Sequence, residues 1–411
     1  MSPSLKSVEE HLEQILGAVE PLGGLELTLS DAHGCVLIED VVASFPLPPF
    51  DNSAMDGYAV RSEDVRSASE ASPVVLPVVG DIAAGNTSPY TVQQGLCVRI
   101  MTGAPMPPGA DAVVPLEDTD GGIAQVAIRH APQPGSCVRS AGEDAQPGTH
   151  VLSAGTHLGA TQLGLLAAVG RDRVVVRPRP RVVVLSTGSE LVEPGQPLAR
   201  GQIPDSNSAL LTAAALEAGA IAFRVGIVPD DPRLLADTLE DQLIRADVVV
   251  TSGGVSVGAY DVVKEVLSRV GTVTFERVAM QPGMPQGFGT IGHDNVPFFG
   301  LPGNPVSAYV SFEVFVRPAL RRMLGVEPIS RPVVRAKVTD ALRSPAGRRS
   351  YLRGWLSVEQ GAYSVRPVGA SGSHLIASLA HANALIVVPE STTEVEAGSP
   401  VTVMMLERRH Q

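Results

Sequence analysis

The sequence predicts a multidomain protein of the α/β plus β class, and two observations carry that prediction. Between residues 181 and 326, runs of β-branched residues alternate with helical patterns, as they do in a parallel α/β sheet. On either side, residues 73–118 and 331–406 contain short strand-like runs, which are typical of small β domains. The 411 residues are enough for roughly two to four domains, each with its own core.

Charge and cysteine content narrow the functional class. A net charge of −12 argues against a general nucleic-acid-binding protein, which would present a basic face. No apolar run reaches the roughly 18 residues that span a membrane, and the first residues lack a signal-peptide pattern. Cys35, Cys97 and Cys137 are widely spaced and form no CxxC pair. We therefore expect buried thiols in a reducing cytoplasm, with no disulfide and no thiolate metal site.

The first 170 residues predict one β domain inserted between two flanking segments. Ser7-Val8-Glu9-Glu10 has the form of a capping box and predicts a helix whose apolar stripe ends near Val19. Residues 155–170 predict another helix, leading back to the first. The β-rich segment between these flanks is therefore expected to be an insertion.

The α/β segment from residue 181 predicts four strands with helices between them. The expected strands are Val182–Leu185, Ala222–Ile227, Val248–Thr251 and Thr272–Phe275. The expected helices are Ala209–Glu217, Leu234–Ile244 and one that follows Asp261. A β-hairpin then leads to Leu301–Ala308, after which an apolar helix runs to about Leu324.

The loop Ser252–Ser256 is the first candidate for a binding site. It follows a buried strand, and its adjacent Gly253 and Gly254 allow a tight turn whose backbone N–H groups approach a ligand closely. A glycine- and serine-rich loop between a strand and a helix is where open α/β sheets bind anions. An ordinary turn is the alternative, because the loop has neither the P-loop nor the dinucleotide-binding spacing.

Two further polar stretches have a structural and a functional interpretation. Asp51, Asn52, Ser53 and Asp56 crowd polar side chains into six positions, which predicts either a well-capped loop or part of a site. Asp205-Ser206-Asn207 precedes an expected helix and predicts an N-cap when it is taken alone.

Seven motifs occur in an order that resembles one known family. They are SAMDGYA at Ser53–Ala59, MTGAPMPPGADAVV at Met101–Val114, AGED at Ala141–Asp144, TGSEL at Thr187–Leu191, SGGVSVG at Ser252–Gly258 followed by Asp261, LPGNPVS at Leu301–Ser307 and GSH at Gly372–His374. Each motif is weak alone, but seven in this order are specific, and matching stretches run from Ser7 to Glu396. The chain resembles the molybdopterin molybdenumtransferases, or molybdenum insertases, which include the C-terminal domain of gephyrin.

The resemblance implies four domains. These are an elongated linker domain at 1–44 and 149–178, an inserted β domain at 45–148, a molybdopterin-binding three-layer α/β domain at 179–326 and a C-terminal β-barrel at 327–411. It also implies a homodimer in which the inserted domain of one subunit faces the α/β domain of the other. The implied reaction converts adenylated molybdopterin (molybdopterin adenylate) and molybdate into molybdenum cofactor and AMP, with Mg²⁺. A molybdopterin adenylyltransferase and molybdoenzymes are the implied donor and acceptors, with no nucleic acid or membrane involved.

The resemblance also implies which residues form the site. The catalytic residues would be Asp261, Asp56, Asp144 and Glu190, of which Asp261, Asp56 and Glu190 would hold the metal. The residues that bind the pterin substrate would be Thr187, Gly188, Asp205, Asn207, Asp230, Ser252, Gly253, Gly254, Ser256, Lys264, Pro302, Pro305, Ser371 and Ser373. Carboxylates that hold Mg²⁺ against phosphate oxygens fit the cleavage of a phosphoanhydride. For Ser371 and Ser373, a local turn bonded by the hydroxyls is the alternative.

One departure from the family pattern affects molybdate. Gln281 and Met284 stand where much of the family carries lysines, so positive charge beside the dianion is expected from other residues. Arg277 is one candidate, and the C-terminal domain offers Arg348, Arg349 and Arg353. The departure leaves open a molybdopterin-binding paralogue with weak or no insertase activity. A molybdopterin adenylyltransferase is disfavoured by the two additional β domains.

Overall fold

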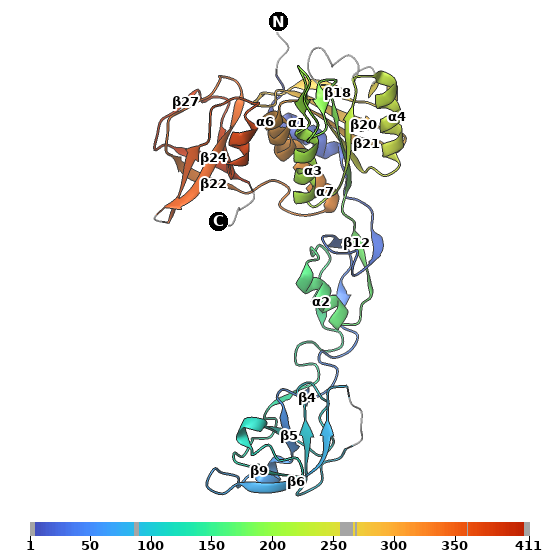
Figure 1. The fold of residues 1–411 in the computed structure, drawn as a ribbon, viewed down its shortest axis with the longest axis vertical. Helices are drawn as coiled ribbons and strands as arrows, with labels where there is room; N and C mark the ends of the chain where they lie inside the picture. The colour runs from blue at the N-terminus through green and yellow to red at the C-terminus, as the bar shows by residue number, and fades with distance from the viewer. Residues whose placement is uncertain (1–4, 86–89, 255–265, 268, 360, 407–411) are drawn as a thin grey trace. The chain divides into compact units, whose positions relative to one another are not determined.

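A computed structural model of the chain describes residues 5–85, 90–254, 266–267, 269–359 and 361–406 (Figure 1). The chain divides into two compact units. The unit that we call the α/β–barrel unit comprises Met1–Glu26, Gly34–Val36 and Val175–Gln411, and the small β unit comprises Leu27–His33 and Leu37–Val174. The chain changes unit four times, within the strands β1 (Leu25–Thr28), β2 (Val36–Leu37) and β12 (Arg173–Arg177) and at the turn between His33 and Gly34.

The α/β–barrel unit is built on a six-stranded sheet in the order β16-β13-β17-β21-β20-β18. Its first four strands are parallel, whereas β20 and β18 add an antiparallel edge. The strands are β13 (Arg181–Thr187), β16 (Ile221–Val228), β17 (Val248–Ser252), β18 (Thr274–Arg277), β20 (Pro285–Ile291) and β21 (Val296–Leu301). The carboxyl ends of β13, β17 and β21 therefore share one edge, where such sheets bind ligands.

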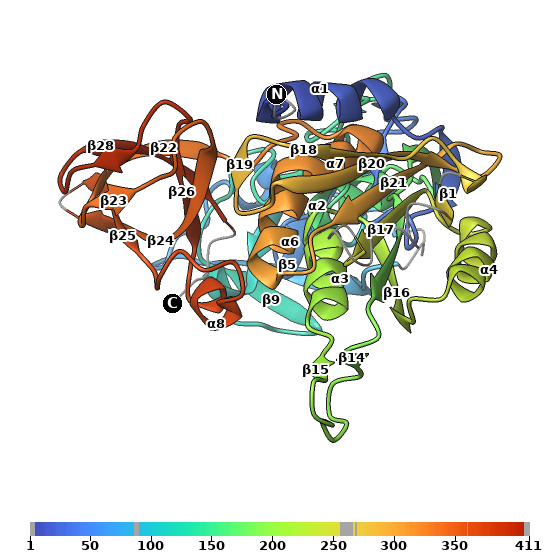
Figure 2. The ribbon, with the colours of Figure 1, turned by 90° about the horizontal axis from the view of Figure 1, so that it is seen from above.

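Side-chain alternation along the central strands builds two cores. Val182 and Val184 of β13 pack in one cluster, whereas Val183 and Leu185 pack in the other. Because successive strand residues point to opposite faces, this buried run requires a helical layer on each side. The helices are α1 (Val8–Ala18), α3 (Asn207–Glu217), α6 (Pro305–Ser311) and α7 (Arg317–Leu324) on the first face, and α4 (Pro232–Leu243) on the second (Figure 2). The sheet and its two helical layers form a three-layer α/β sandwich.

Helix α1 begins as its sequence predicts. The Ser7 hydroxyl accepts from the Glu10 N–H, and the Glu10 carboxylate accepts from the Ser7 N–H, so both halves of the capping box are present. Val8 and Ile15 are buried in the first core, and the ring of His11 lies between those of Phe288 and Phe315. None of the described helices is long and apolar enough to cross a membrane.

The C-terminal part of this unit is a closed five-stranded barrel. Its strands pair in the order β24-β25-β22-β28-β26, and β26 pairs back onto β24. The strands are β22 (Val333–Val338), β24 (Arg349–Glu359), β25 (Ala362–Pro367), β26 (Ala384–Val388) and β28 (Pro400–Met405), and a short helix, α8 (Ile376–Ala380), precedes β26. The two-residue strand β19 (Met280–Gln281) pairs with the start of β24 and joins the barrel to the segment after β18.

The small β unit contains a five-stranded sheet in the order β8-β5-β7-β6-β9. These strands are β5 (Gly57–Val60), β6 (Val74–Ile82), β7 (Cys97–Ile100), β8 (Ala112–Pro115) and β9 (Gln125–Ile128). Shorter pairs join β4 (Asn52–Ser53) to β10 (Val138–Arg139), and β3 (Val41–Val42) to β11 (His150–Leu152). Tyr58 and Val60 pack in one cluster and Ala59 in another, so both faces of β5 are covered.

The fold class is confirmed, and the differences from the sequence prediction have local causes. The helix predicted over 155–170 is only α2 (Ala160–Ala168), because Gly155 has a positive φ and Gly159 lies at the N-cap. The apolar helix to Leu324 contains a π-helical turn at Phe312–Val316 between α6 and α7. The strand predicted at Thr272–Phe275 is shifted to β18 and runs antiparallel to its neighbour. The assignment of four domains stays a prediction.

Candidate functional site

Two side chains at the start of α3, Asn207 and Asp205, join the ends of three parallel strands. Asn207 Nδ2 donates to the Ser252 hydroxyl, at the end of β17, and to the Gly303 carbonyl, beyond β21, at 2.6 Å each. Asp205, two residues earlier, accepts from the Ser186 hydroxyl of β13 at 2.9 Å and from the Ser208 N–H at 3.0 Å. The predicted cap therefore has a second role, because it joins α3 to the ends of neighbouring strands.

The glycine loop after β17 lies close to the end of β13. Gly253 has a φ of +91°, and a Cβ atom there would lie 2.3 Å from the Thr187 carbonyl oxygen. A side chain is therefore excluded on two grounds, the backbone conformation and the contact. The Gly253 N–H donates to the Leu301 carbonyl. Thr187, Gly253 and Pro302 thus share the carboxyl edge of the sheet, with Gly188 and Gly254 beside them and Pro305 at the start of α6.

Buried oxygen atoms at this edge lack hydrogen-bond partners among the described residues. They are Thr187 Oγ1, Asp205 Oδ2, Asn207 Oδ1 and Asp230 Oδ1. Arg224 Nη2 lies 3.7 Å from Asp205 Oδ2, which is an ion pair without a hydrogen bond. An unsatisfied buried polar atom is costly, and four at one sheet edge are the pattern expected where a polar ligand binds.

Acidic side chains occupy the loops after β13 and β16. Asp230 Oδ2 accepts from the Ser189 N–H at 3.2 Å, which ties these loops together, and Glu190 is the exposed neighbour of Ser189. Carboxylate oxygens are the ligands that Mg²⁺ prefers, so the donor set suits this ion in chemical type. Within the described residues, however, no group of three or more His, Cys, Asp or Glu side chains could hold a metal by itself.

A cavity lies between the α/β sandwich and the barrel, and we call it the barrel cleft. It measures about 430 Å³. Val306 N–H donates to the Ser373 carbonyl and Asn304 Nδ2 donates to its hydroxyl, so the loop before α8 is fixed to the start of α6. The lining residues are Met280, Gln281, Pro282, Gly283, Met284, Ser307, Arg348, Ser371, Gly372, Ser373 and His374.

The arginines expected to replace the missing lysines have different environments. Arg348 lines the barrel cleft, whereas Arg349 is paired with Glu9 and, at 2.9 Å, with Glu390. Arg353 is buried and donates to the carbonyls of Ala370 and Gly372, which supports the loop that carries Ser371 and Ser373. Arg277 donates to the Met284 sulfur at 3.1 Å. Arg348 is thus the arginine of the three barrel candidates that lines the cleft.

The small β unit carries Asp56 and Asp144 on exposed loops. Asp56 Oδ1 accepts from the Thr102 N–H at 2.7 Å and from its hydroxyl at 2.8 Å, so the first two motifs of the sequence meet there. These bonds, the backbone N–H first, lower the pKa of Asp56 and keep it ionised. Asp144 is held through its backbone N–H, which donates to the Leu47 carbonyl, and the residue is exposed.

Three predicted site residues lie outside the described residues, namely Asp261, Ser256 and Lys264. Sequence reasoning did not predict Ser307, which lines the barrel cleft, or Asn304 and Gln286, which support its walls. Ser307 and Asn304 could have been found because they belong to the motif LPGNPVS. No motif marked Gln286, whose partner Ser311 is 25 residues away on another element.

Known proteins match this chain in sequence over almost its whole length. Three family models match in order: the MoeA N-terminal region (domain I and II) at residues 6–170, a probable molybdopterin binding domain at 183–322 and the MoeA C-terminal region (domain IV) at 335–406. Molybdopterin molybdenumtransferase 2 of Mycobacterium tuberculosis is 46% identical over 405 residues, which cover 97% of this chain and 99% of that protein. The chain belongs to the molybdopterin molybdenumtransferase family.

Other members and a solved structure support the same conclusion. The molybdopterin molybdenumtransferase of Nostoc is 41% identical, covering 91% of this chain and 87% of that protein. The crystal structure of a molybdopterin biosynthesis MoeA protein from Pyrococcus horikosii matches with a TM-score of 0.76 and 34% identity, over 99% of this chain and 100% of that one. The resemblance inferred from seven motifs is thus confirmed, and the molybdenumtransferase fold is shared.

Proposed function

We propose that this chain inserts molybdate into adenylated molybdopterin, releasing AMP and forming molybdenum cofactor. The observation that carries the proposal is 46% identity to a molybdopterin molybdenumtransferase over 97% of the chain. The site chemistry supports it, because a sheet edge with unpaired buried polar atoms adjoins glycine loops, and a separate cleft carries an arginine. The alternative of a binding paralogue without insertase activity rests on Gln281 and Met284 alone, and the curated relatives do not favour it.

The sheet edge is the proposed site of the pterin substrate. Its phosphates are anions, and backbone N–H groups at glycine loops and helix starts bind anions well. Asn207 holds the loops after β17 and β21 at fixed positions, so little reorganisation would be needed on binding. We assign substrate binding to Thr187, Gly188, Asp205, Asn207, Asp230, Ser252, Gly253, Gly254, Pro302 and Pro305, together with Ser256 and Lys264.

The barrel cleft is the proposed site of molybdate. Arg348 supplies a positive charge, and Ser307, Ser371 and Ser373 supply hydroxyl donors. Both kinds of group would bind a dianion well, because a hydrogen bond to a charged group is stronger than one between two neutral groups. Gln281 and Met284 make this cleft less cationic than the lysine-bearing pattern would be.

Mg²⁺ is the proposed resident ion, held by Asp261, Glu190 and Asp56 together with substrate phosphate oxygens. When bound, it would neutralise charge that develops on the phosphoanhydride during cleavage. Asp144 is proposed to act beside these carboxylates. The described carboxylates fit Mg²⁺ by donor type but form no complete site alone, so phosphate oxygens are part of the proposal.

The proposed working assembly is a cytoplasmic homodimer. Asp56 and Asp144 belong to the inserted β domain, and we propose that they serve the α/β domain of the partner subunit. The substrate would come from a molybdopterin adenylyltransferase, and the product would pass to molybdoenzymes.

The experiment that tests the proposed function is a turnover assay. Purified protein is mixed with adenylated molybdopterin and Mg²⁺, and AMP is quantified with and without molybdate. AMP release that requires molybdate is the expected result. Bound pterin with no molybdate-dependent AMP would support the binding paralogue and contradict the proposal.

A further inference from the structure

The loop Met280–Met284 lines the barrel cleft without a side-chain cation, so the donors it can offer an anion are the Gln281 side-chain amide and its peptide N–H groups. Its two ends are fixed by backbone bonds. Val278 N–H donates to the Met284 carbonyl at 2.8 Å, and Met280 and Gln281 pair with the start of β24. Lys6 adds a further strand-like bridge at Val278. The tip of the loop is oriented separately, by the buried side chain of Gln286.

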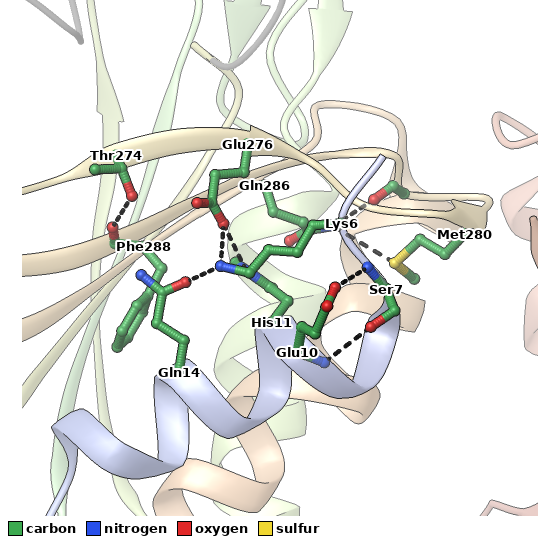
Figure 3. Close-up of polar contacts among 11 residues, drawn as sticks. Lys6, Ser7, Glu10, His11, Gln14, Thr274, Glu276, Met280, Gln286 and Phe288 are labelled. Carbon is green, nitrogen blue, oxygen red and sulfur yellow. Dashed lines mark hydrogen bonds and ion pairs between the residues drawn. The ribbon is translucent and has the colours of Figure 1, made fainter. Parts of the chain in front are cut away.

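Gln286 on β20 reaches the tip of the loop from inside the protein. It is 2% exposed, and its Nε2 donates to the Gly283 carbonyl at 2.5 Å and to the Ser311 hydroxyl on α6 at 2.6 Å. Figure 3 shows Gln286 directed toward Met280, whose sulfur lies 4.0 Å from the same nitrogen. An amide NH₂ has two donors, and both are used, so the direction of the Gly283 carbonyl is fixed from the core.

The loop geometry requires this close approach. Gly283 has a φ of +98°, and a Cβ atom there would lie 2.8 Å from the Ser311 hydroxyl oxygen. A side chain would therefore push the loop away from α6, and glycine lets the carbonyl reach Gln286.

The orientation of that carbonyl determines the orientation of the next N–H. The Gly283 carbonyl and the Met284 N–H belong to one planar peptide unit, in which a trans peptide points the two groups in opposite directions. Since the carbonyl points inward to buried Gln286, the Met284 N–H points outward, and Met284 lines the cleft.

We propose that Gln286 is a positioning residue that aims the Met284 N–H into the barrel cleft as a donor for a tetrahedral oxyanion. The inference rests on the proposed function for the identity of that anion, molybdate. A fixed peptide donor then does part of the work that a lysine does elsewhere in the family. It needs no charge, but it depends on the buried hydrogen bond from Gln286 to the Gly283 carbonyl.

The test compares Gln286→Met with the wild type in oxyanion binding and in turnover. Methionine keeps the length and volume of the side chain but donates no hydrogen bond, so the peptide loses its fixed orientation. Molybdate binding by calorimetry, without pterin, is expected to weaken about tenfold or more, in line with the loss of one oriented donor. The molybdate concentration for half-maximal AMP release should rise by a similar factor, while kcat at saturating molybdate changes less. Gln94→Met, an exposed glutamine in the small β unit, makes the same chemical change and should alter neither value.

A purely structural role for Gln286 predicts a different pattern. The variant would then unfold at a lower temperature but bind molybdate with the wild-type midpoint while folded, and that result would overturn the proposal. Should Gln286→Met fail to fold, Ser311→Ala serves instead, because it frees one of the two donors and should weaken binding several-fold. Wild-type binding of molybdate without AMP release would remove the proposed function but leave this inference standing, whereas no binding by the wild type would overturn it.

Discussion

At the level of single residues, the proposed molybdate site depends on where positive charge lies relative to the barrel cleft. Three neighbouring arginines on the barrel have three different roles: Arg348 lines the cleft, Arg349 pairs with carboxylates and Arg353 holds backbone carbonyls. Two unit charges about 4 Å apart interact by about 4 kcal/mol at an effective dielectric of 20, before desolvation is subtracted. After desolvation is subtracted, we expect Arg348 to strengthen the free energy of molybdate binding by roughly 1–2 kcal/mol.

Arg348→Gln should raise the molybdate concentration for half-maximal AMP release about tenfold, since 1.4 kcal/mol is a factor of ten. Thermal stability should change little, because the side chain is half-buried at the edge of a cleft. Arg366→Gln, which removes the same charge from an exposed site on β25, provides the matched control. Equal midpoints for wild type and Arg348→Gln would mean that neutral donors alone hold the anion.

The sequence indicated residues of this site mainly where a motif carried them. Most of the carboxylates, the glycine loop and the serines lie in or beside short contiguous motifs, whereas Asp205, Asn207 and Asp230 were named from the family resemblance alone. Neither the distinction between Arg348 and Arg349 nor the role of Gln286 could be predicted. Both depend on which side of a strand faces the cleft and on partners far away in the chain.

At the element scale, α1 shows how a short helix is fixed to the edge of the sheet. Lys6 Nζ pairs with Glu276 of β18 at 2.8 Å, and His11 Nδ1 lies 3.3 Å from the same carboxylate (Figure 3). Burial lowers the pKa of His11 to about 4, although Glu276 opposes the shift. The imidazole is therefore neutral in the folded protein at neutral pH.

This lowered pKa predicts a loss of stability in mild acid. Below pH 6.5 His11 is protonated in the unfolded chain but stays neutral in the folded protein. The free energy of unfolding therefore falls as the pH drops toward 4. The full effect over that window is about 3 kcal/mol, and roughly half or more should be present by pH 5. His11→Phe keeps the ring but cannot titrate, so urea unfolding at pH 7 and pH 5 should show a smaller decrease in the variant. An identical decrease in both proteins would contradict the assignment.

The segment from α6 to α7 contains a buried ion pair inside its π-helical turn. Glu313 is 1% exposed and binds Arg331 through both oxygens, at 2.8 and 3.0 Å. The apolar pattern of this segment predicted a continuous helix and gave no sign of a π-helical turn. The spacing of apolar residues within this helix carries no information about Arg331, the charged partner that lies beyond its end.

Glu313→Gln should destabilise the α/β–barrel unit by about 3 kcal/mol, because it removes the close counter-charge of the buried Arg331 guanidinium and leaves only Glu217, at 3.6 Å. Glu394→Gln is the comparison, since Glu394 faces Arg343 on the surface at 3.8 Å and should cost less than about 0.5 kcal/mol. Urea titrations of the two variants against wild type measure both values. Similar small losses for both would mean that the buried pair is already compensated by its neighbours.

At the scale of the whole molecule, the proposed dimer brings Asp56 of one subunit to the α/β domain of the other. The alternation of strands and helices predicted the α/β sandwich because a doubly covered parallel sheet leaves a strong pattern in sequence. The closure of the barrel is less visible, since it depends on β26 pairing back onto β24. The proposed sharing of a site between subunits follows from family resemblance and therefore needs a direct test.

Mixing Asp56→Asn with Asp261→Asn provides that test. Each protein alone should be nearly inactive, because each lacks one proposed metal-binding carboxylate at every site. After subunit exchange, a mixed dimer holds one site with both aspartates and one with neither, so part of the activity should return. Exchange verified by native mass spectrometry without any recovered activity would exclude the shared site.

The most direct test of the proposed function compares the amount of molybdenum incorporated into pterin with the amount of AMP released. In a single turnover with limiting adenylated molybdopterin, molybdate and Mg²⁺, AMP is measured by chromatography and pterin-bound molybdenum by mass spectrometry. The account predicts one molybdenum atom in the pterin product for each AMP released, and no AMP when molybdate is omitted. AMP released without molybdenum in the product, or no AMP at all, would contradict it.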